Sequence, residues 1–430
     1  LFYTTRTFMK HKNCLLLTLF ALFVVANCTT LYVIEGGTDT VTCSSSSPCG
    51  SISAALTVFG DSTSDLTIKF DDGDFTGEEN TNIVFPSVPV TLEPADSDEV
   101  PTFSCVNQNS DIAFTASSDF TLDNIIIKNC KTGVLFLGDS LELDSAVFIN
   151  NGISVDITET SSLEVDSCTF SEGSDFSIRF VYLETMGKLE IKQSTFDAAG
   201  VSFVLGVDNT VKASIDKCTF NNTNSAIFIT EGDWDITDSI ILNCGSGISF
   251  QGIGTYTQLD VNNINVSECT YGISFDSDGT LDIEGGEFEV DQTAINVSSA
   301  SGVEIEENVN FLSGFSPIVI ATTFPVELEI KDLIFNLTGP SIFTLPNGSN
   351  VTMTDCLFTS PFGALIISGG SWTLKNVDVN VAAFGLHLNH GGAFSLSGSE
   401  ATFTISECDF FEPASIGNGG CVFIDGPAVA

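Results

Sequence analysis

The stretch LEVDSCTF, residues 163–170, decides the fold, because its pattern recurs along the chain. Apolar and polar residues alternate in it with period two, which is typical of a strand with one buried face. The pattern returns as LELDSAVF, LEIKQSTF, ASIDKCTF, LDIEGGEF, LEIKDLIF, VTMTDCLF and FTISECDF, beginning at 141, 189, 213, 281, 328, 351 and 403. Looser copies begin at 120, 234, 259, 303 and 372, so the mean step is about 24 residues.

A second alternating block follows most copies of the first, for example GVLFLG (133–138), GISFQG (247–252) and GISFDS (272–277). Asn, Gly, Ser and Asp lie between the blocks and are turn residues. Such short strands cannot bury a face alone, whereas stacked coils about 4.8 Å apart can. The sequence therefore predicts an all-β fold, a right-handed parallel β-helix (solenoid) of about 13–16 coils with an N-terminal cap.

Stacking turns equivalent positions of the repeat into columns. Position 8 of the first block predicts an aromatic ladder inside the rod, made of Phe148, Phe170, Phe196, Phe220, Phe288, Phe335, Phe358 and Phe410. Cysteines at position 6 are expected to be small buried residues of this core, namely Cys168, Cys218, Cys356 and Cys408.

The N-terminal region reads differently. A basic start followed by the apolar run 14–26 predicts that residues 1–28 are upstream residues plus a secretory signal peptide. A lipoprotein signal that acylates Cys28 is the alternative. Residues 29–65 are predicted to form the cap, with a short helix in SISAAL (51–56), and residues 66–430 the β-helix. We expect the chain to be truncated at its C-terminal end, or that end to be closed by another molecule.

Composition limits the function. The chain has 13 Lys+Arg against 56 Asp+Glu, a formal net charge of −43. Phosphate recognition needs clustered cations, so nucleic-acid binding is excluded. Acids recur at outward positions 2 and 4 of the first block, namely Glu142, Asp144, Glu164, Asp166, Asp282, Glu284, Glu304 and Glu306. They form either a solvated face that prevents aggregation or a weak Ca²⁺-binding face.

Secretion implies two covalent modifications. Glycan acceptor motifs occur at Asn221, Asn265, Asn296, Asn336, Asn347 and Asn350. By alternation, Asn265 and Asn296 face outward on strands, and the other four fall in turns. Cys43 and Cys49 bracket a short loop and predict one disulfide, whereas Cys244 and Cys269 occupy equal positions in adjacent coils and permit a second.

The two-block coil over residues 60–430 is similar to the right-handed parallel β-helix repeats of pectin-lyase-like proteins. The chain also resembles polymorphic outer membrane protein repeats, through Phe148-Ile149-Asn150-Asn151, Gly391-Gly392-Ala393 and Gly419-Gly420-Cys421-Val422. The first resemblance implies polysaccharide lyases or hydrolases among its members. The second implies surface display and adhesion.

Residues suited to catalysis are sparse. Arg179 is expected to be a reachable, outward-facing cation, and His387 and His390 are spaced as a two-ligand pair. Two ligands without a neighbouring carboxylate or thiolate make a weak metal site. We therefore assign no catalytic residue and no metal ligands, and expect no cofactor beyond weak Ca²⁺ binding.

The sequence favours a secreted or cell-surface structural and adhesive rod, glycosylated, which contacts extracellular proteins, glycans or copies of itself. A polysaccharide lyase or hydrolase and a non-catalytic glycan-binding module stay open as alternatives. No membrane-spanning segment is expected in the chain.

Overall fold

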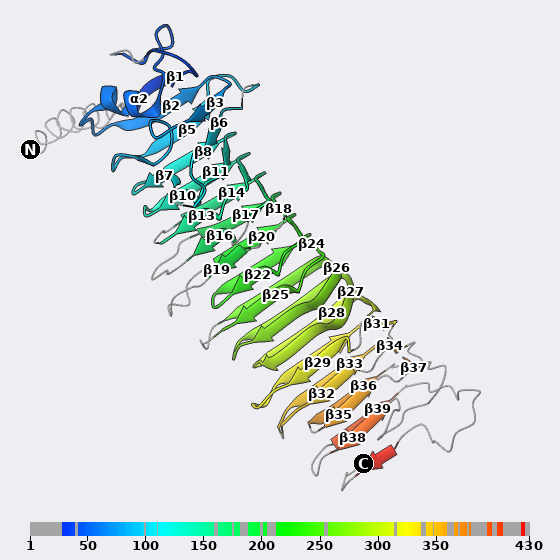
Figure 1. The fold of residues 1–430 in the computed structure, drawn as a ribbon. Helices are drawn as coiled ribbons and strands as arrows, with labels where there is room; N and C mark the ends of the chain where they lie inside the picture. The colour runs from blue at the N-terminus through cyan, green and yellow to red at the C-terminus, as the bar shows by residue number, and fades with distance from the viewer. Residues whose placement is uncertain are drawn as a thin grey trace, which may run out of the picture.

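The computed structural model describes residues 28–38, 42–98, 100–109, 111–158, 162–173, 176–180, 188–197, 201–203, 212–252, 257–313, 316–336, 341–346, 348–358, 365–368, 370–375, 378–379, 394–397, 402–406 and 423–425. Its strands pair in parallel and form one long rod (Figure 1). Each coil contributes strands to three ladders that run along this rod.

The first sheet holds the first block of every repeat. Its ladder runs through β1 (Cys28–Val33), β2 (Asp65–Phe70), β5 (Val90–Pro94), β8 (Phe120–Asp123), β11 (Ser140–Asp144), β14 (Ser162–Asp166), β17 (Lys188–Lys192), β20 (Lys212–Asp216) and β23 (Asp233–Thr237). It continues through β26 (Gln258–Asp276), β27 (Thr280–Ser299), β28 (Gly302–Ser313), β30 (Glu327–Lys331), β33 (Asn350–Thr354), β36 (Ser371–Lys375) and β39 (Thr402–Ser406).

The second sheet is made of shorter strands. It contains β3 (Asp74–Thr76), β6 (Thr102–Ser104), β9 (Ile126–Lys128), β12 (Val147–Ile149), β15 (Thr169–Ser171), β18 (Thr195–Asp197), β21 (Thr219–Asn221), β24 (Ile240–Leu242), β31 (Ile334–Phe335), β34 (Leu357–Phe358) and β37 (Asp378–Val379). Three long strands, β26 to β28, bend through the corner and supply both the first and the second sheet.

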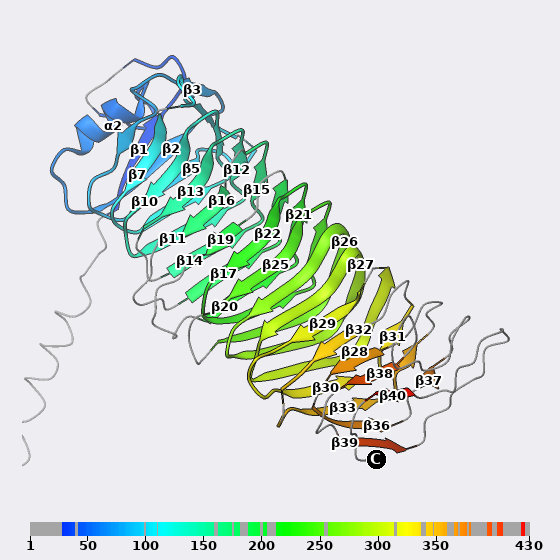
Figure 2. The same cartoon turned by 60° about the horizontal axis from the view of Figure 1, so that its bottom comes forward.

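The third sheet holds the second block of the repeat. It contains β4 (Ile83–Val84), β7 (Ile112–Ala116), β10 (Thr132–Phe136), β13 (Ile153–Ile157), β16 (Phe176–Phe180), β19 (Val201–Phe203), β22 (Ser225–Ile229), β25 (Ser246–Gln251), the ends of β26 and β27, β29 (Ile318–Ala321), β32 (Ser341–Thr344), β35 (Leu365–Ser368), β38 (Phe394–Ser397) and β40 (Phe423–Asp425). The predicted parallel solenoid is thus confirmed (Figure 2).

Coils stack with identical positions in register. Leu141 pairs with Leu163, and Leu163 pairs with Leu189, so a single buried column forms from one position of the repeat. The corner after the first sheet holds one residue with positive φ in most coils, such as Ser167 at 55° and Asn263 at 54°. Polar residues at these corners allow the sharp change of direction that a β-branched residue resists.

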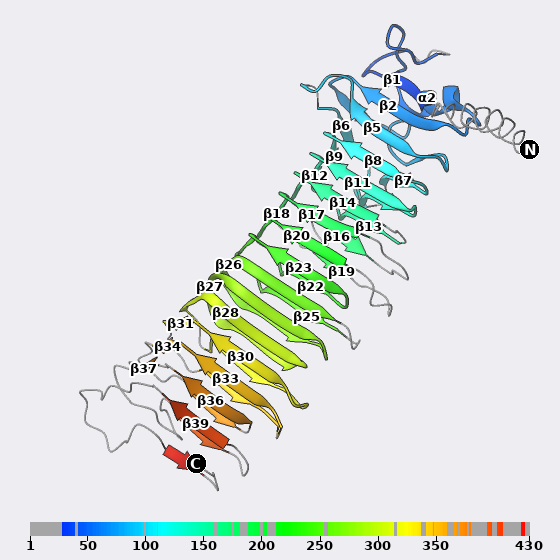
Figure 3. The same ribbon diagram turned by 180° about the vertical axis from the view of Figure 1, so that it is seen from behind.

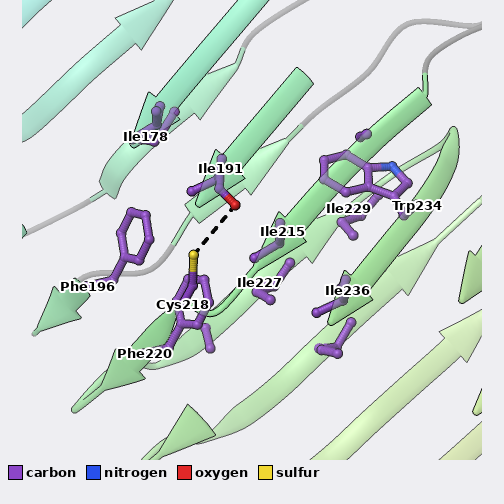
Figure 4. Packing of buried hydrophobic residues seen from close by; sticks show 14 of the residues in the cluster. Ile178, Ile191, Phe196, Ile215, Cys218, Phe220, Ile227, Ile229, Trp234 and Ile236 are labelled. Atoms are coloured by element: carbon purple, nitrogen blue, oxygen red, sulfur yellow. Dashed lines mark hydrogen bonds between the residues drawn. The ribbon is translucent and has the colours of Figure 1, made fainter. Parts of the chain in front are cut away.

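The interior is mainly aliphatic and aromatic. Figure 4 shows Ile191, Ile215 and Ile236, from β17, β20 and β23, following one another through the core. Cys218 is buried beside them, and its thiol lies 3.7 Å from the carbonyl oxygen of Ile191. Of the four position-6 cysteines, Cys168, Cys218 and Cys356 are free and buried, as expected, and Cys408 lies outside the described residues.

The aromatic ladder is confirmed in two stacks. Rings from Phe148 to Phe220 follow at 5.0, 4.8 and 4.7 Å between centroids, nearly parallel. Ile241 and Val266 then replace phenylalanine in the column. The second stack joins Phe288, Phe335 and Phe358 through Phe311, which the repeat pattern missed. Phe410 lies outside the described residues.

The N-terminal end is capped as expected. Helix α2 (Ile52–Phe59) begins at Ser51, whose hydroxyl accepts a hydrogen bond from the Ala54 backbone N–H. Its apolar face buries Ile52, Ala55 and Phe59. The helix lies at the N-terminal end of the rod (Figure 3). The boundary predicted at residue 66 is less sharp than expected, because β1 already pairs with β2 over its full length.

Three disulfides join residues that the structure describes. The two expected pairs, Cys43–Cys49 and Cys244–Cys269, are present. A third, Cys105–Cys130, joins adjacent coils near the N-terminal end. Sequence reasoning missed it because Cys105 precedes the regular repeats, so no position in the pattern marked it as the partner of Cys130.

Candidate functional site

The outward side of the first sheet is the most distinctive surface of the rod. Alternation along each strand places block positions 1 and 3 in the core and positions 2 and 4 in solvent. We call these outward side chains the acidic face. It contains the eight predicted acids and, in the same two columns, Asp123, Glu190, Asp216, Asp235, Asp260 and Glu329.

Three carboxylates of this face converge. Glu304 and Glu306 lie on β28, and Glu329 is the register partner of Glu304 on β30. One oxygen from each lies within 4.8 Å of the others, with Glu306 half-buried and the other two exposed. Sequence reasoning identified the first two and missed Glu329, whose strand also carries lysine.

A shallow groove of about 340 Å³ runs over this part of the face. Asp282, Glu304 and Glu329 line it from three successive strands, and Gln258 and Asn350 close its two ends. The groove therefore offers only oxygen and amide groups at its polar rim. Such a surface suits hydrated cations, ammonium groups or sugar hydroxyls.

Crowding of like charges changes protonation here. A hydrogen bond with Glu306, burial and the surrounding acids together raise the pKa of Glu304 to about 7. Burial and the charge of Asp260 raise the pKa of Asp282 as well. The only lysine close to this group in the described residues is Lys331, whose ammonium lies 3.7 Å from Glu306. The crowded acids thus favour the protonated form of Glu304.

In the middle of the acidic face, lysines neutralise the acids. On β17, Lys188 lies 2.9 Å from Glu164 and 2.7 Å from Glu190, and Lys192 contacts Glu190 from the other side. The hydrogen bond from Lys188 holds the pKa of Glu190 below its usual range. The acidic face therefore consists of two acidic stretches separated by a neutralised coil.

Arg179 faces outward, as expected from the sequence, but it is held in an ion pair. Its guanidinium is half-buried and binds Asp156 with two hydrogen bonds, from Nε at 3.0 Å and from Nη2 at 2.6 Å. Asp156 is its register partner on the neighbouring coil, so stacking decides the pairing. A bidentate pair of this kind leaves the arginine occupied rather than poised for proton abstraction.

The predicted glycan acceptors differ in their surroundings. Asn265 is exposed on β26 and Asn336 is exposed after β31, whereas Asn296 is half-buried on β27. Asn221 and Asn350 were expected in turns, and this prediction is wrong: they end β21 and begin β33. The sheets extend up to the corner residues, so little separate turn exists. Asn347 lies outside the described residues.

Other predicted features also lie outside the described residues. These are His387 and His390, the Gly391-Gly392-Ala393 and Gly419-Gly420-Cys421-Val422 motifs, and residues 1–27 of the predicted signal peptide. In the part of the chain that the structure describes, no helix has the length and apolar content needed to cross a bilayer.

The described Phe148–Asn151 motif has a local role. Asn150 adopts positive φ at the second corner, and its side-chain amide donates to Asn129 at 2.8 Å. Asn151 is buried and bridges coils, accepting from the Cys130 N–H and donating to the Ile127 carbonyl oxygen. These contacts explain the motif by the fold alone.

Comparison with known proteins identifies the fold. A family model described as "Right handed beta helix region" matches residues 95–220, which include β6 to β20. No curated protein and no solved structure matches the chain.

Proposed function

This chain is a right-handed parallel β-helix protein, and from that premise we propose that it is a secreted or cell-surface structural and adhesive rod. One observation carries the proposal: the first-sheet ladder is unbroken from β1 to β39, and its outward columns carry two acidic stretches, one on each side of the β17 coil. Flat, repetitive surfaces of solenoids suit extended contacts with other molecules.

The net charge of the chain supports a function based on binding other molecules. The net charge of −43 keeps copies of the rod apart in solution and favours partners that carry cationic groups. Extracellular proteins with basic surfaces fit this description, and neutral glycans can bind through hydroxyl–carboxylate hydrogen bonds. The glycans we propose at the acceptor asparagines would add solubility.

Catalysis has less support. In the pectin-lyase-like class, a lyase or hydrolase needs a base or acid free to act on a sugar, and the described arginine is bound to Asp156. Glu304 lies on an open groove, where water competes with any substrate. We therefore keep polysaccharide turnover as the rival hypothesis.

Adhesion can be tested with the full chain on beads coated with poly-lysine, neutral dextran or the protein itself. We expect retention on the cationic beads at low salt, falling steeply above physiological ionic strength, where the Debye length is about 8 Å. The variant Glu304→Gln/Glu329→Gln should weaken it. The matched variant Glu287→Gln/Glu289→Gln changes two exposed acids on the second sheet and should not.

Turnover of pectin or alginate by the same preparation, lost on changing Arg179 or His387, would replace the adhesive proposal with the enzymatic one. Binding on a glycan array without turnover would select the glycan-binding module. Equal retention of both double variants would show that the acidic face is not the contact surface.

A second candidate role is weak Ca²⁺ binding, which the convergence of Glu304, Glu306 and Glu329 favours. Oxygen-only sites of extracellular modules bind Ca²⁺ with a Kd of about 0.1–1 mM. At 10 mM Ca²⁺ and a Kd of 1 mM, the gain in folding free energy is about 1.4 kcal/mol. An unchanged melting temperature in 10 mM CaCl₂, with MgCl₂ as the ionic-strength control, would exclude this role.

A further inference from the structure

A second groove lies at the corner where β26, β27 and β28 bend from the first sheet into the second. Its volume is about 490 Å³, within the range of sites that hold small ligands. Asn263 and Asn265 line it from β26, Glu287 from β27, and Asn308 and Asn310 from β28. All five side chains are polar and can hydrogen-bond to hydroxyl and amide groups.

The groove exists because the middle coil lacks side chains at its corner. Gly285 and Gly286 have φ of 68° and 106° there. A Cβ on Gly286 would lie 2.1 Å from the Ile264 carbonyl oxygen, so this position requires glycine. β28 also carries one more residue than β27 at the corner, since Glu284 pairs with Glu306 but Gly286 pairs with Val309.

Asn265 opens onto this groove and begins an acceptor motif, Asn265-Val266-Ser267. It is exposed, and its side-chain amide has no hydrogen-bond partner among the described residues. In register, Asn265 lies beside Glu287, which lies beside Asn310. A group attached to the Asn265 amide would therefore have polar side chains along one flank.

The other described acceptor asparagines are less favourable sites for a glycan than Asn265. Asn221 is half-buried and its amide donates to Asp197 at 3.2 Å, while the hydroxyl of Thr223, the third residue of its motif, is buried. The amide of Asn350 donates to Glu327 at 2.9 Å. Asn296 is half-buried.

Asn336 is exposed, but it does not line the corner groove. It therefore serves as the comparison site, since a sugar there would lie outside this groove.

We propose that Asn265 carries an N-linked glycan whose first sugar lies in the corner groove. In the transfer, the Asn265 Nδ2 forms a bond to C1 of the first sugar of a lipid-linked oligosaccharide diphosphate. The bond from C1 to the diphosphate oxygen breaks, and the amide proton leaves with the diphosphate. The inference rests on the proposed function in one respect, since it requires passage through a secretory pathway.

Transfer acts on the chain before it folds, so the fold decides which modified chains survive. A glycan at Asn265 needs no native hydrogen bond to be given up, and its acetamido and hydroxyl groups gain partners at Glu287 and Asn310. A glycan at Asn221 would have to be accommodated at a half-buried strand end that already binds Asp197. Folded, secreted protein should therefore be enriched in the Asn265-modified form.

The test uses the full chain, secreted from eukaryotic cells behind a heterologous signal sequence. Site occupancy is measured by mass spectrometry of glycopeptides, and peptide-N-glycosidase release is then timed on native and denatured protein. We expect Asn265 to be occupied, and its glycan to be released at least about fivefold more slowly from native than from denatured protein. The glycan of Asn336 should be released at similar rates from both.

Gly285→Asn is the matched variant. Asparagine tolerates positive φ, as Asn263 shows at the same corner of the preceding coil, so the fold should persist while the groove is filled. Release from Asn265 should then approach the denatured rate. Sedimentation at the wild-type rate checks that the rod is intact.

Three results of this test would overturn the inference or part of it. Occupied Asn336 with empty Asn265 overturns the inference and leaves the secreted rod standing. A protein that is secreted with every acceptor empty overturns both the inference and the glycosylated form of the rod. Fast native release from Asn265, unchanged by Gly285→Asn, overturns the groove as the seat of the sugar.

Discussion

Two coils of the first sheet, β17 and β28, share their inward residues and differ in their outward ones. Both place aliphatic residues at positions 1 and 3, and glutamate at position 2, as Glu190 and Glu304. On β17, two lysines flank the glutamate and lower its pKa. On β28, the flanking groups are Gly302 and Glu306, and the pKa of Glu304 rises to about 7.

The difference shows that fold and surface chemistry are encoded separately along one strand. Burial of the odd positions sets the register of every coil, and the even positions are then free to carry either sign of charge. Function in such a rod is therefore to be sought in the even columns, where neighbours in space are about 24 residues apart in the chain.

The largest effect on stability should come from the buried phenylalanine stacks, which both regions share. Phe196→Ala and Phe335→Ala each remove a fully buried ring from one of the stacks. We expect each to cost about 3–5 kcal/mol in the free energy of unfolding, measured by urea denaturation. The exposed Thr195→Ala is the control and should change stability by at most about 0.5 kcal/mol. A large difference between the two phenylalanines would show that the stacks are not equivalent.

The two glutamates should respond to pH in opposite directions. The pKa of Glu304 is raised in the folded protein, so its protonated form stabilises the fold at low pH, and that stabilisation is lost as pH rises toward 7. The pKa of Glu190 is lowered, so its stabilising effect is present above the unfolded pKa and is lost as pH falls.

Melting curves from pH 4 to pH 8 for the wild type, Glu304→Gln and Glu190→Gln check this contrast. We expect Glu304→Gln to raise stability at pH 8 by about 1 kcal/mol or less, because the carboxyl is exposed and solvent screens it. Glu190→Gln should lower stability at pH 8 instead. The same sign of change in both variants would contradict the assignment of their surroundings.

The smallest effect should come from converting β17 into the acidic type. Lys188→Gln removes the ammonium that contacts Glu164 and Glu190. We expect a loss of about 0.2–1 kcal/mol, greater at low salt, and a higher pKa for Glu190 by NMR titration. Lys212→Gln, on the next coil, is the control, because Lys212 makes no ion pair with the described residues. Identical results for the two variants would mean that the pairing has no energetic consequence.

The repeat made most of the architecture predictable. Alternation with a 24-residue period identified the inward columns, the phenylalanine ladder, the buried position-6 cysteines and the Cys244–Cys269 disulfide. The short loop between Cys43 and Cys49 predicted a second disulfide. Local chemistry identified the cap helix, because Ser51 precedes an apolar run. All these predictions depend only on distance along the chain.

Three corrections share one cause, which is that contact between coils depends on register rather than on pattern. Phe311 escaped the ladder because one extra residue at the β28 corner displaces it from position 8. Arg179 was expected to be reachable, but the register of the neighbouring coil pairs its guanidinium with Asp156. Glu329 was missed because its own strand carries a lysine, and only the stacking of the coils places it beside Glu304.

Periodicity in this chain was enough to establish a solenoid with a dry aromatic core and an acidic exterior, since alternation and spacing are properties of the linear polymer. Which acids crowd together, which cation is already bound and which acceptor asparagine faces an open groove depended on how neighbouring coils align. A one-residue shift at a corner moves every later side chain to a new neighbour, and no spacing rule along a single strand records that shift.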